Sequence, residues 1–525
     1  MLSLLLWLPL GFGLACMLAP RRTAPWLAVA GSLVALGLAA GLVADFDTDA
    51  AGLQHTVDAS WISELGVRYQ LGVDGISLFL VGLTALLWAA ATVFSALRGY
   101  PGSAEAPADP GRTRLYYFLL GLGETAVLGA FLAQDLLLFV LFFDLMLVPF
   151  YFLIGIFGGR NRIAATTKMI VYTLVGSLLM LVGAIATAIL AANQTGGELS
   201  FAIADLRANL LSEGSQEWIF CFFAAAFLVK MPAFPIHGWM PDAYRAAPLP
   251  VLALLSGVLS KVGAYGFLRV VFPLYPDATA TFQELVLVIG VASILYGSVM
   301  AFTQTNVRLI AGYSSIAQLG FVTIGVFSLR ADGADGAVLQ MVNHGLAVAA
   351  VFLIIAVLYE RAGTEDLRRM GGLALRAPVL AGLFLVVTMA TLAMPGSANF
   401  IGEFYILNGV FQAKIVYALV AGIGVALAAF YALRLYQRTM HNRLPEGAES
   451  REITVGDGAV LVPLVGVIVA LAFYPGLILE RGEAAVDDKV GTVTAAAGGN
   501  CREFAYSETT VGEPAAAGIV VVCDE

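Results

Sequence analysis

Six ionisable residues lie inside long apolar stretches of this sequence: Glu124, Asp144, Lys230, Lys261, His344 and Glu403. A charged side chain in hydrocarbon costs about 2.5–3.5 kcal/mol on insertion scales, so such residues usually line a path for ions or protons. Any one of them could instead be a structural ion pair, and for a lone His344 that interpretation would be favoured. Six together favour a proton path, because buried charges add little to stability.

These residue types suit proton transfer. Burial disfavours the charged form of Lys230, and a nearby carboxylate such as Asp144 favours it. A change in their separation would therefore load or unload a proton on the lysine. Lys261 and His344 could pass the proton on, since histidine titrates near neutrality. Glu403 could then release it.

Composition identifies the elements that must position these groups. Of the 525 residues, 60% are hydrophobic and 12% are charged, against roughly 25% charged in soluble domains. Apolar runs long enough to cross a bilayer as helices predict an all-α membrane protein. About fourteen such stretches lie near 2–19, 26–44, 75–97, 115–133, 136–157, 169–192, 217–235, 251–273, 283–303, 310–329, 337–359, 378–413 (interrupted), 416–437 and 459–480.

Basic residues predict the orientation. Most of the 28 Lys and Arg residues fall in alternate loops, beginning with Arg21 and Arg22. Since cytoplasmic loops carry this excess, we expect both termini to be extracytoplasmic. The net charge of −9 then reflects acidic external loops such as "DFDTDA" at 45–50. No basic, aromatic-interleaved surface is present, so nucleic acid is not indicated as a partner.

Two segments carry helix-breaking residues beside a buried charge. Prolines 232, 235 and 241 follow Lys230, and Pro395 with Gly396 precedes Glu403. Proline removes a backbone donor, so each segment is predicted to be a broken helix. Paired broken helices predict inverted repeats, here 115–273 and 283–438, with simple proline kinking as the alternative. The other divisions are the N-terminal helices at 1–114, the last helix at 459–480, and an extracytoplasmic tail at 482–525 that could be disordered.

The four cysteines argue against a redox centre. Cys16 and Cys221 fall within apolar stretches, and no CxxC pair, paired histidine motif or phosphate-binding glycine loop is present. We therefore expect no haem, Fe–S cluster, metal or nucleotide in this chain. Cys501 and Cys523 lie in the tail, where an external location would allow a disulfide. Two free thiols are the alternative.

Four motifs, in order, make a family resemblance specific. They are "FDLMLVPFYFLIGIFGG" (143–159), "PIHGWMPDAYRAAP" followed by "VLSKVGAYGFLR" (235–248 and 258–269), "AGYSSIAQLGF" (311–321) and "NFIGEF" (399–404). Over roughly 1–480 the chain resembles the antiporter-like subunits of proton-pumping NADH–quinone oxidoreductase, respiratory complex I. Glu403 makes it similar to the chain M type, because chains N and L and the antiporter subunits usually have lysine there.

The resemblance implies a fold and a set of roles. The fold has fourteen helices with inverted five-helix repeats at helices 4–8 and 9–13. The family's proton-translocating residues fall on Lys230, Lys261, His344 and Glu403, and its helix-five acid falls on Asp144.

Two departures from the family pattern and three further residues qualify those roles. Asp144 stands where the family usually has glutamate and is shorter by one methylene, and Tyr244 stands where many chain M sequences have histidine. His237 and Asp242 match the family and are expected to shape the break. Glu124 could align proton uptake or pair locally.

The implied activity is proton translocation as a membrane subunit of NADH:quinone oxidoreductase, without redox chemistry in this chain. FMN, Fe–S clusters and a quinone would be bound by other subunits, and the partners would be neighbouring membrane-arm chains, including antiporter-like ones. The implied location is the bacterial plasma (inner) membrane. Two alternatives stay open: a subunit of a multi-subunit cation/proton antiporter or membrane-bound hydrogenase, and a structural spacer subunit without pumping.

Overall fold

The computed structural model describes the chain except for residues 49–51, 101–111, 445–450, 499–500, 508–516 and 524–525. Its first half contains α1 (Leu2–Leu18), α2 (Ala24–Asp45), β1 (Gln54–Ile62), β2 (Val67–Val73), α3 (Gly75–Leu97), α4 (Thr113–Leu132), α5 (Leu136–Leu145), α6 (Leu147–Phe157), α7 (Arg162–Thr195), α8 (Ile203–Ala208), α9 (Glu213–Lys230), α10 (Met240–Ala246), α11 (Leu249–Leu254), the π turn η2 (Leu255–Leu259), α12 (Lys261–Gly266), the π turn η3 (Phe267–Val271) and α13 (Phe272–Leu274).

The second half contains α14 (Pro276–Thr281), α15 (Gln283–Thr303), α16 (Val307–Val326), α17 (Ala331–Ala362), α18 (Pro378–Thr391), α19 (Ala398–Met440), α20 (Val455–Phe473), α21 (Gly476–Ala496), β3 (Cys501–Ser507) and β4 (Ala517–Cys523). Short 3-10 turns occur at Ser63–Leu65, Leu367–Arg369 and Leu373–Leu375.

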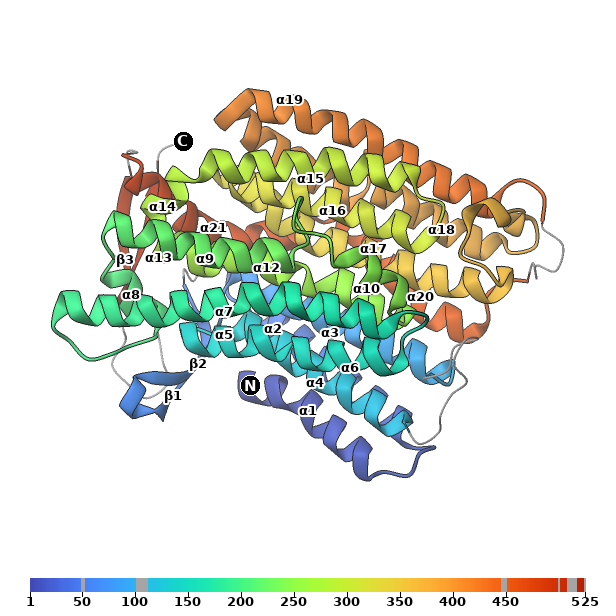
Figure 1. Cartoon of the computed structure of the whole chain (residues 1–525), viewed down its shortest axis with the longest axis horizontal. Coiled ribbons are helices and arrows are strands. Elements are labelled where there is room, and N and C mark those ends of the chain that lie inside the picture. The colour runs from blue at the N-terminus through green and yellow to red at the C-terminus, as the bar shows by residue number, and fades with distance from the viewer. Residues whose placement is uncertain (49–51, 101–111, 445–450, 499–500, 508–516, 524–525) are drawn as a thin grey trace.

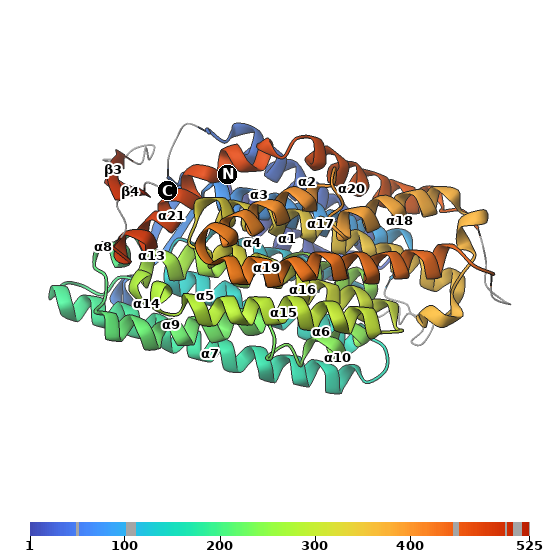
Figure 2. The same ribbon diagram turned by 90° about the horizontal axis from the view of Figure 1, so that it is seen from above.

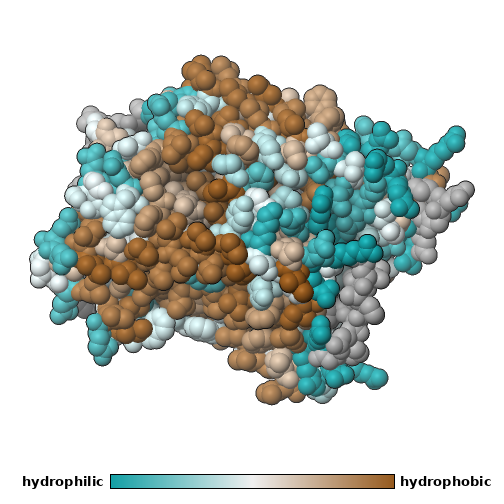
Figure 3. All heavy atoms as spheres, in the orientation of Figure 1, coloured by the Kyte–Doolittle hydropathy of each residue, from teal (hydrophilic) through white to brown (hydrophobic). Residues whose placement is uncertain are grey.

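The long helices run side by side along the longest axis of the molecule (Figures 1 and 2). Apolar residues cover much of the visible face, and hydrophilic residues gather toward the two ends of that axis (Figure 3). Within the described residues, 11 helices are long and apolar enough to cross a membrane, and α1 and α18 are shorter apolar helices. The predicted all-α membrane class is confirmed, while the count of fourteen helices and the inverted repeats stay predictions.

Three of these spans are enclosed by the others. The most apolar windows of α16, of α17 and of the run Leu249–Leu274 are 100% buried inside the bundle, compared with 39% for α2. A helix that is apolar on all sides needs neighbours on all sides or lipid around it. The enclosed helices carry Lys261 and His344, so these two groups lie at the centre of the protein, away from lipid.

Local sequence sets where the site helices begin. Asp135, Asn306 and Ser397 each accept a backbone N–H at the N-terminus of α5, α16 and α19, respectively. Such caps satisfy donors that have no partner within the helix. The cap at Ser397 follows Pro395 and Gly396, and it restarts the helix one turn before Glu403.

Glycines let α17 and α19 approach closely beside the acidic group of the second break. A Cβ at Gly336 would lie 2.6 Å from the backbone nitrogen of Ile406, and a Cβ at Gly402 would lie 2.5 Å from Oε1 of Gln340. Small residues at such contacts allow helix backbones to pack tightly in membranes. Glu403 is therefore held against α17.

Several segments differ from the sequence expectations. The last apolar helix ends at Phe473 instead of 480, and α21 follows with Ile478, Val486, Val490 and Val493 buried. That helical spacing of apolar residues lies in a stretch too polar to be recognised by hydropathy. Strands β3 and β4 pair beyond it, so the segment for which disorder was considered contains regular structure. Helix α19 continues through the predicted loop, with a kink at Lys414 (φ −150°, ψ 82°).

A β-hairpin between α2 and α3 was also missed. Strands β1 and β2 pair in antiparallel fashion, with register shifts between Gln54 and Val57 and between Ser60 and Ile62. Its residues alternate only weakly in polarity, which explains why the sequence predicted a loop there.

Candidate functional site

Lys230 is the last residue of α9, where the helix ends before the proline-containing segment. It is 5% exposed. Its Nζ donates to the carbonyl of Phe143 at 3.3 Å and lies 4.6 Å from the centre of the Phe143 ring. A backbone carbonyl and an aromatic face both stabilise a cation in a buried site.

Asp144, next to Phe143 on α5, is the acidic neighbour of this lysine. It interacts electrostatically with Lys230 and with Ser177. Its Oδ1 is buried without a hydrogen-bond partner, and in the part of the chain that the structure describes the lysine and the aspartate form no ion pair within 4.0 Å. The predicted proximity is thus present, and the direct partner of the lysine is the backbone.

Lys261 begins α12, immediately after the π turn η2. It is fully buried. Its Nζ donates to the carbonyl of Ser256 at 2.5 Å and to Oγ of Ser260 at 3.2 Å. A π turn disturbs the regular i→i−4 pattern and is frequent at functional sites. Here a carbonyl of this turn accepts the buried ammonium group.

His344 lies on the enclosed helix α17 and is 2% exposed. Neither ring nitrogen has a hydrogen-bond partner within the described residues. It interacts electrostatically with Lys261 and lines a cavity of ≈ 20 Å³ together with Ser314 and Tyr431. A cavity of this size can hold a water molecule, and polar groups are available to bind it.

Glu403 lies at the second break and is 2% exposed. Gln318 on α16 donates from Nε2 to Oε1 of Glu403 at 2.7 Å, and Gln340 on α17 donates from Nε2 to Oε1 of Gln318 at 2.6 Å. Oε2 of Glu403 is buried without a partner. The amide chain therefore holds one carboxyl oxygen and leaves the other as the atom that can exchange a proton.

Sequence reasoning missed three of these groups: Gln318, Gln340 and Tyr431. Tyr431 is 1% exposed, its hydroxyl forms no hydrogen bond of regular geometry with the described residues, and it interacts electrostatically with Glu403 and Gln318. It also lines the cavity beside His344. Gln318 stands within the quoted motif 311–321, and that position was the available signal. Nothing in the sequence alone relates Tyr431, far along α19, to Glu403.

Two further cavities lie on the side of Lys230. One of ≈ 20 Å³ is lined by Lys230, Tyr244 and Ser260, and so adjoins the residue that accepts from Lys261. A larger one of ≈ 990 Å³ is lined by charged residues of the loops expected to be cytoplasmic, among them Arg160 and Arg245. Tyr244 thus lines the cavity beside Lys230, together with Ser260.

Glu124 is separate from this line. It is 2% exposed, its Oε1 has no partner, and it lines a cavity of ≈ 10 Å³ with Trp88 and Thr92 among helices α1–α4. The structure places it neither in a local ion pair nor beside the other five groups.

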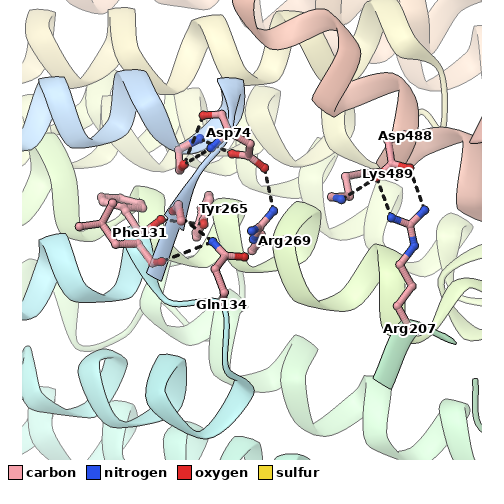
Figure 4. Close-up of polar contacts among 11 residues, drawn as sticks. Asp74, Phe131, Gln134, Arg207, Tyr265, Arg269, Asp488 and Lys489 are labelled. Atoms are coloured by element: carbon pink, nitrogen blue, oxygen red, sulfur yellow. Dashed lines mark hydrogen bonds and ion pairs between the residues drawn. The ribbon is translucent and has the colours of Figure 1, made fainter. Parts of the chain in front are cut away.

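Other charges have structural partners. Asp242 pairs with Lys168 at 2.8 Å, which agrees with a role in shaping the loop after the break. Arg269 is 4% exposed and pairs with Asp74 at 2.7 Å (Figure 4). A partner at the start of α3 removes the need to reach water.

A third set of charged residues joins α8 to α21. Arg207 on α8 holds Asp488 of α21 through two hydrogen bonds of 2.8 Å and also donates to Thr492 (Figure 4). The charge of the aspartate is supported further by Lys489, whose Nζ lies 2.6 Å from it. Burial raises the pKa of Asp488, but Lys489 and Arg207 outweigh it and lower this pKa to about 2. Helix α21 is thereby fixed to the bundle.

No group of three His, Cys, Asp or Glu side chains that could hold a metal ion is found among the described residues. The ionisable groups of the site are instead distributed along α5, α9, α12, α17 and α19. Such a distribution suits stepwise transfer of a small ion better than fixed coordination.

This fold and this line of buried groups define an antiporter-like membrane protein. A family model described as "NADH:quinone oxidoreductase/Mrp antiporter, TM" matches residues 133–428. NADH-quinone oxidoreductase subunit M of Rhodobacter capsulatus is 36% identical over 91% of this chain and 94% of its own length. The subunit M of Escherichia coli (strain K12) is 36% identical over 93% and 97%.

Solved structures agree. A chain of respiratory complex I from Thermus thermophilus superposes with a TM-score of 0.83 at 30% identity, covering 93% of this chain and 99% of the other. A chain of the Mrp complex from Dietzia sp. gives 0.80 at 21% identity, covering 94% and 99%, and shares the fold. The chain belongs to the NADH:quinone oxidoreductase/Mrp antiporter family, in its NADH-quinone oxidoreductase subunit M group.

Proposed function

We propose that this chain translocates protons as a membrane-arm subunit of NADH:quinone oxidoreductase. The observation that carries the proposal is the line of buried ionisable groups on enclosed helices, with water-sized cavities beside Lys230 and His344. Among the described residues, Asp144, His344 and Glu403 each have a buried polar atom without a hydrogen-bond partner. Lys230 and Lys261 donate only to carbonyl or hydroxyl oxygens. The other carboxyl oxygen of Glu403 accepts from an amide. A purely structural charge in a membrane would be expected to have a full set of partners.

The proposed order of transfer follows the contacts. A proton reaches Lys230 from the large charged cavity, and Asp144 tunes the charge of this lysine. Water in the cavity beside Ser260 links it to Lys261, and electrostatic repulsion between Lys261 and His344 couples their charge states. Tyr431, which lines a cavity with His344 and interacts electrostatically with Glu403, then provides the link to Glu403.

The amides Gln318 and Gln340 hold the acceptor but do not carry the proton. An amide N–H does not ionise in the range accessible to proteins, and Gln318 and Gln340 donate to Glu403 and Gln318, respectively. Transfer to Glu403 therefore uses water and Tyr431, and the amide chain sets which carboxyl oxygen receives the proton.

The chain has no redox role in this proposal. The electron-transfer groups, FMN, Fe–S clusters and a quinone, belong to other subunits of the complex, and neighbouring antiporter-like chains are the partners. The relatives are bacterial, so the location is the plasma membrane, and we propose extracytoplasmic termini from the distribution of Arg and Lys.

NADH-driven proton pumping in membrane vesicles tests the proposal with the variant Lys230→Ala. Assembly is checked by native gel, and Lys414→Ala, which removes an exposed lysine paired with Glu284 at 2.8 Å, is the matched control. We expect a fall of about tenfold or more in pumping and coupled NADH oxidation, as for loss of a proton-transfer group, with the control unchanged. Wild-type pumping by Lys230→Ala would favour the structural spacer.

The remaining alternative concerns the partners. Glu403 favours the oxidoreductase over a cation/proton antiporter, because antiporter subunits of the family usually have lysine there. Isolation of the assembled complex distinguishes them: NADH oxidation in the purified complex supports the proposal, and cation/proton exchange without it supports the antiporter or hydrogenase reading.

A further inference from the structure

The C-terminal hairpin brings two cysteine positions together in the backbone. Strands β3 and β4 pair in antiparallel fashion with an unbroken register, from Ser507 opposite Ala517 to Cys501 opposite Cys523. Strand β3 begins with Cys501, and strand β4 ends with Cys523. Cys501 and Cys523 are thus the outermost pair, at the open end of the hairpin.

Direct cross-strand opposition meets the spacing of a disulfide. Residues directly opposite in an antiparallel pair have Cα atoms about 4.5–5.5 Å apart. Disulfides join residues whose Cα atoms are about 4.4–6.8 Å apart. The strand pairing therefore allows the bond without a change in backbone position.

The hairpin is also a segment that needs such a bond. A two-stranded hairpin alone is marginally stable in water. Here the hairpin follows α21, which contacts β4 and is fixed to the bundle by Arg207 and Asp488. A cross-link at the open end would join the end of β4 to the residue that leaves this anchored helix, and so hold the last strand against it.

We propose that Cys501 and Cys523 form an intramolecular disulfide that closes the β3–β4 hairpin. This inference uses the extracytoplasmic orientation proposed above, because disulfides persist on that side of the membrane. It is independent of proton translocation.

The bond forms by thiol–disulfide exchange with a disulfide donor of the extracytoplasmic space. One cysteine thiolate attacks a sulfur of the donor disulfide and gives a mixed disulfide. The second cysteine thiolate attacks the protein sulfur of that intermediate, which forms the Cys501–Cys523 bond and releases the donor as a dithiol. The two protein thiols lose two electrons, the donor gains them, and the protons pass to the reduced donor.

The other two cysteines serve as internal standards. Cys16 on α1 is buried and donates its thiol to the carbonyl of Ala24. Cys221 on α9 is exposed, on a surface that we expect lipid to cover. Both are free in the structure, and neither lies near the hairpin in sequence.

The test counts thiols in the full chain within its complex. Cells are quenched in acid, the protein is denatured, and free thiols are alkylated with a maleimide–polyethylene glycol before and after reduction. The chain has 4 cysteines, so we expect about two adducts without reductant and all 4 with it. A complete set of adducts without reductant would overturn the proposal.

Variants separate an internal bridge from other oxidation. In Cys501→Ser the remaining tail thiol should be free, so the adduct number should not depend on reductant, and Cys16→Ser should keep the dependence. A reductant-dependent shift that persists in Cys501→Ser, or a non-reducing dimer of the wild type, would place Cys523 in a different disulfide and overturn the proposal.

The side of the membrane on which the tail lies is tested separately. Labelling of Cys523 in intact cells of the Cys501→Ser variant by a membrane-impermeant maleimide supports an external tail. Absence of this label, with labelling restored after lysis, would overturn the orientation and the disulfide together. External labelling with a full thiol count in the wild type would overturn the disulfide alone.

Discussion

The two broken helices place opposite charges at opposite helix ends. At the first break, Lys230 is the last residue of α9, where the helix dipole favours a cation. At the second, Glu403 lies in the second turn of α19, which begins at Ala398, near the end that favours an anion. The end of α9 therefore gives Lys230 a local field that supports its charged form, whereas Glu403 lies beyond the first turn of α19, where this effect has largely fallen off.

The partners at the two breaks differ in kind. Lys230 donates to a backbone carbonyl, and this contact changes only if α5 and α9 move relative to each other. Glu403 accepts from the side chain of Gln318, which is itself held by Gln340. Rotation of side chains is enough to change that contact. The first break therefore responds to helix movement and the second to side-chain rearrangement.

The largest expected effect is at the second break. Glu403→Gln removes the titratable group while keeping its size, and no other carboxyl group contacts Gln318 among the described residues. We expect NADH-driven proton pumping to fall at least about tenfold with assembly retained, as for loss of a proton-transfer group. Glu284→Gln, which changes an exposed glutamate, is the control. Pumping above half of the wild-type rate would remove Glu403 from the path.

A smaller effect is expected from the acid at the first break. Asp144→Asn removes the electrostatic partner of Lys230 but leaves the carbonyl of Phe143 as its acceptor. We expect a loss of about fivefold in pumping, less than for Lys230→Ala, since one charge neighbour shifts an equilibrium without removing the group. Asp144→Glu should restore activity. If Asp144→Asn lowers proton pumping as much as Lys230→Ala does, the carbonyl of Phe143 is not the main group that stabilises the charged lysine.

Gln318 gives the sharpest test of the difference between the breaks. Gln318→Leu leaves a buried carboxyl oxygen without its donor, which costs about 1–3 kcal/mol. We expect a loss of about threefold in pumping and a displaced pH profile. Gln318→His keeps a donor and should recover most of the rate. An unchanged pH profile in Gln318→Leu would show that the amide does not act through Glu403.

The smallest effect on pumping is expected outside both breaks. The folded-state pKa of Asp488 is about 2, below its usual 3.8, so the charged carboxylate stabilises the docking of α21. That contribution is complete above about pH 4 and is lost as the pH falls toward 2, following the linkage of proton binding to stability. Asp488→Asn should therefore speed proteolysis of α21 at neutral pH and leave pumping within about twofold, as for a contact remote from the site.

Asp205→Asn is the matched control for that measurement. Asp205 lies on the same short helix as Arg207 and accepts from Ser200 without touching α21 in any described contact. If proteolysis of α21 is equally fast in both variants, the Arg207–Asp488 pair is not what anchors the helix.

Much of the site was predictable because charge in an apolar run is conspicuous. Lys230, Lys261, His344 and Glu403 could each be selected from the cost of burying them, and prolines located the breaks. Gln318, Gln340 and Tyr431 could not be selected this way. Neutral polar side chains are common in membrane helices, and their importance depends on which helices meet. The close approach of α17 and α19 decides that, and it is a tertiary property.

The fold was predictable where hydropathy dominates and less so where it does not. Helix α21 is amphipathic and polar overall, and the two hairpins lack strong alternation, so all three escaped a search for apolar runs. The ion pair of Arg269 was not predicted either, because its partner Asp74 is distant in sequence. An ion pair between such distant residues cannot be predicted from the local sequence around either residue.

The two π turns on either side of Lys261–Gly266 have a consequence for changes in chain length. A π turn contains one residue more than an α-helical turn spanning the same rise. Deletion of one residue within Leu255–Leu259 would convert the π turn to an α-helical turn and leave Lys261 and Tyr265 facing nearly the same direction, whereas the same deletion in a regular α-helix would rotate the following residues by about 100°. In sequence comparisons, a single-residue gap in this segment would therefore mark the loss of the π turn, with the direction of Lys261 retained.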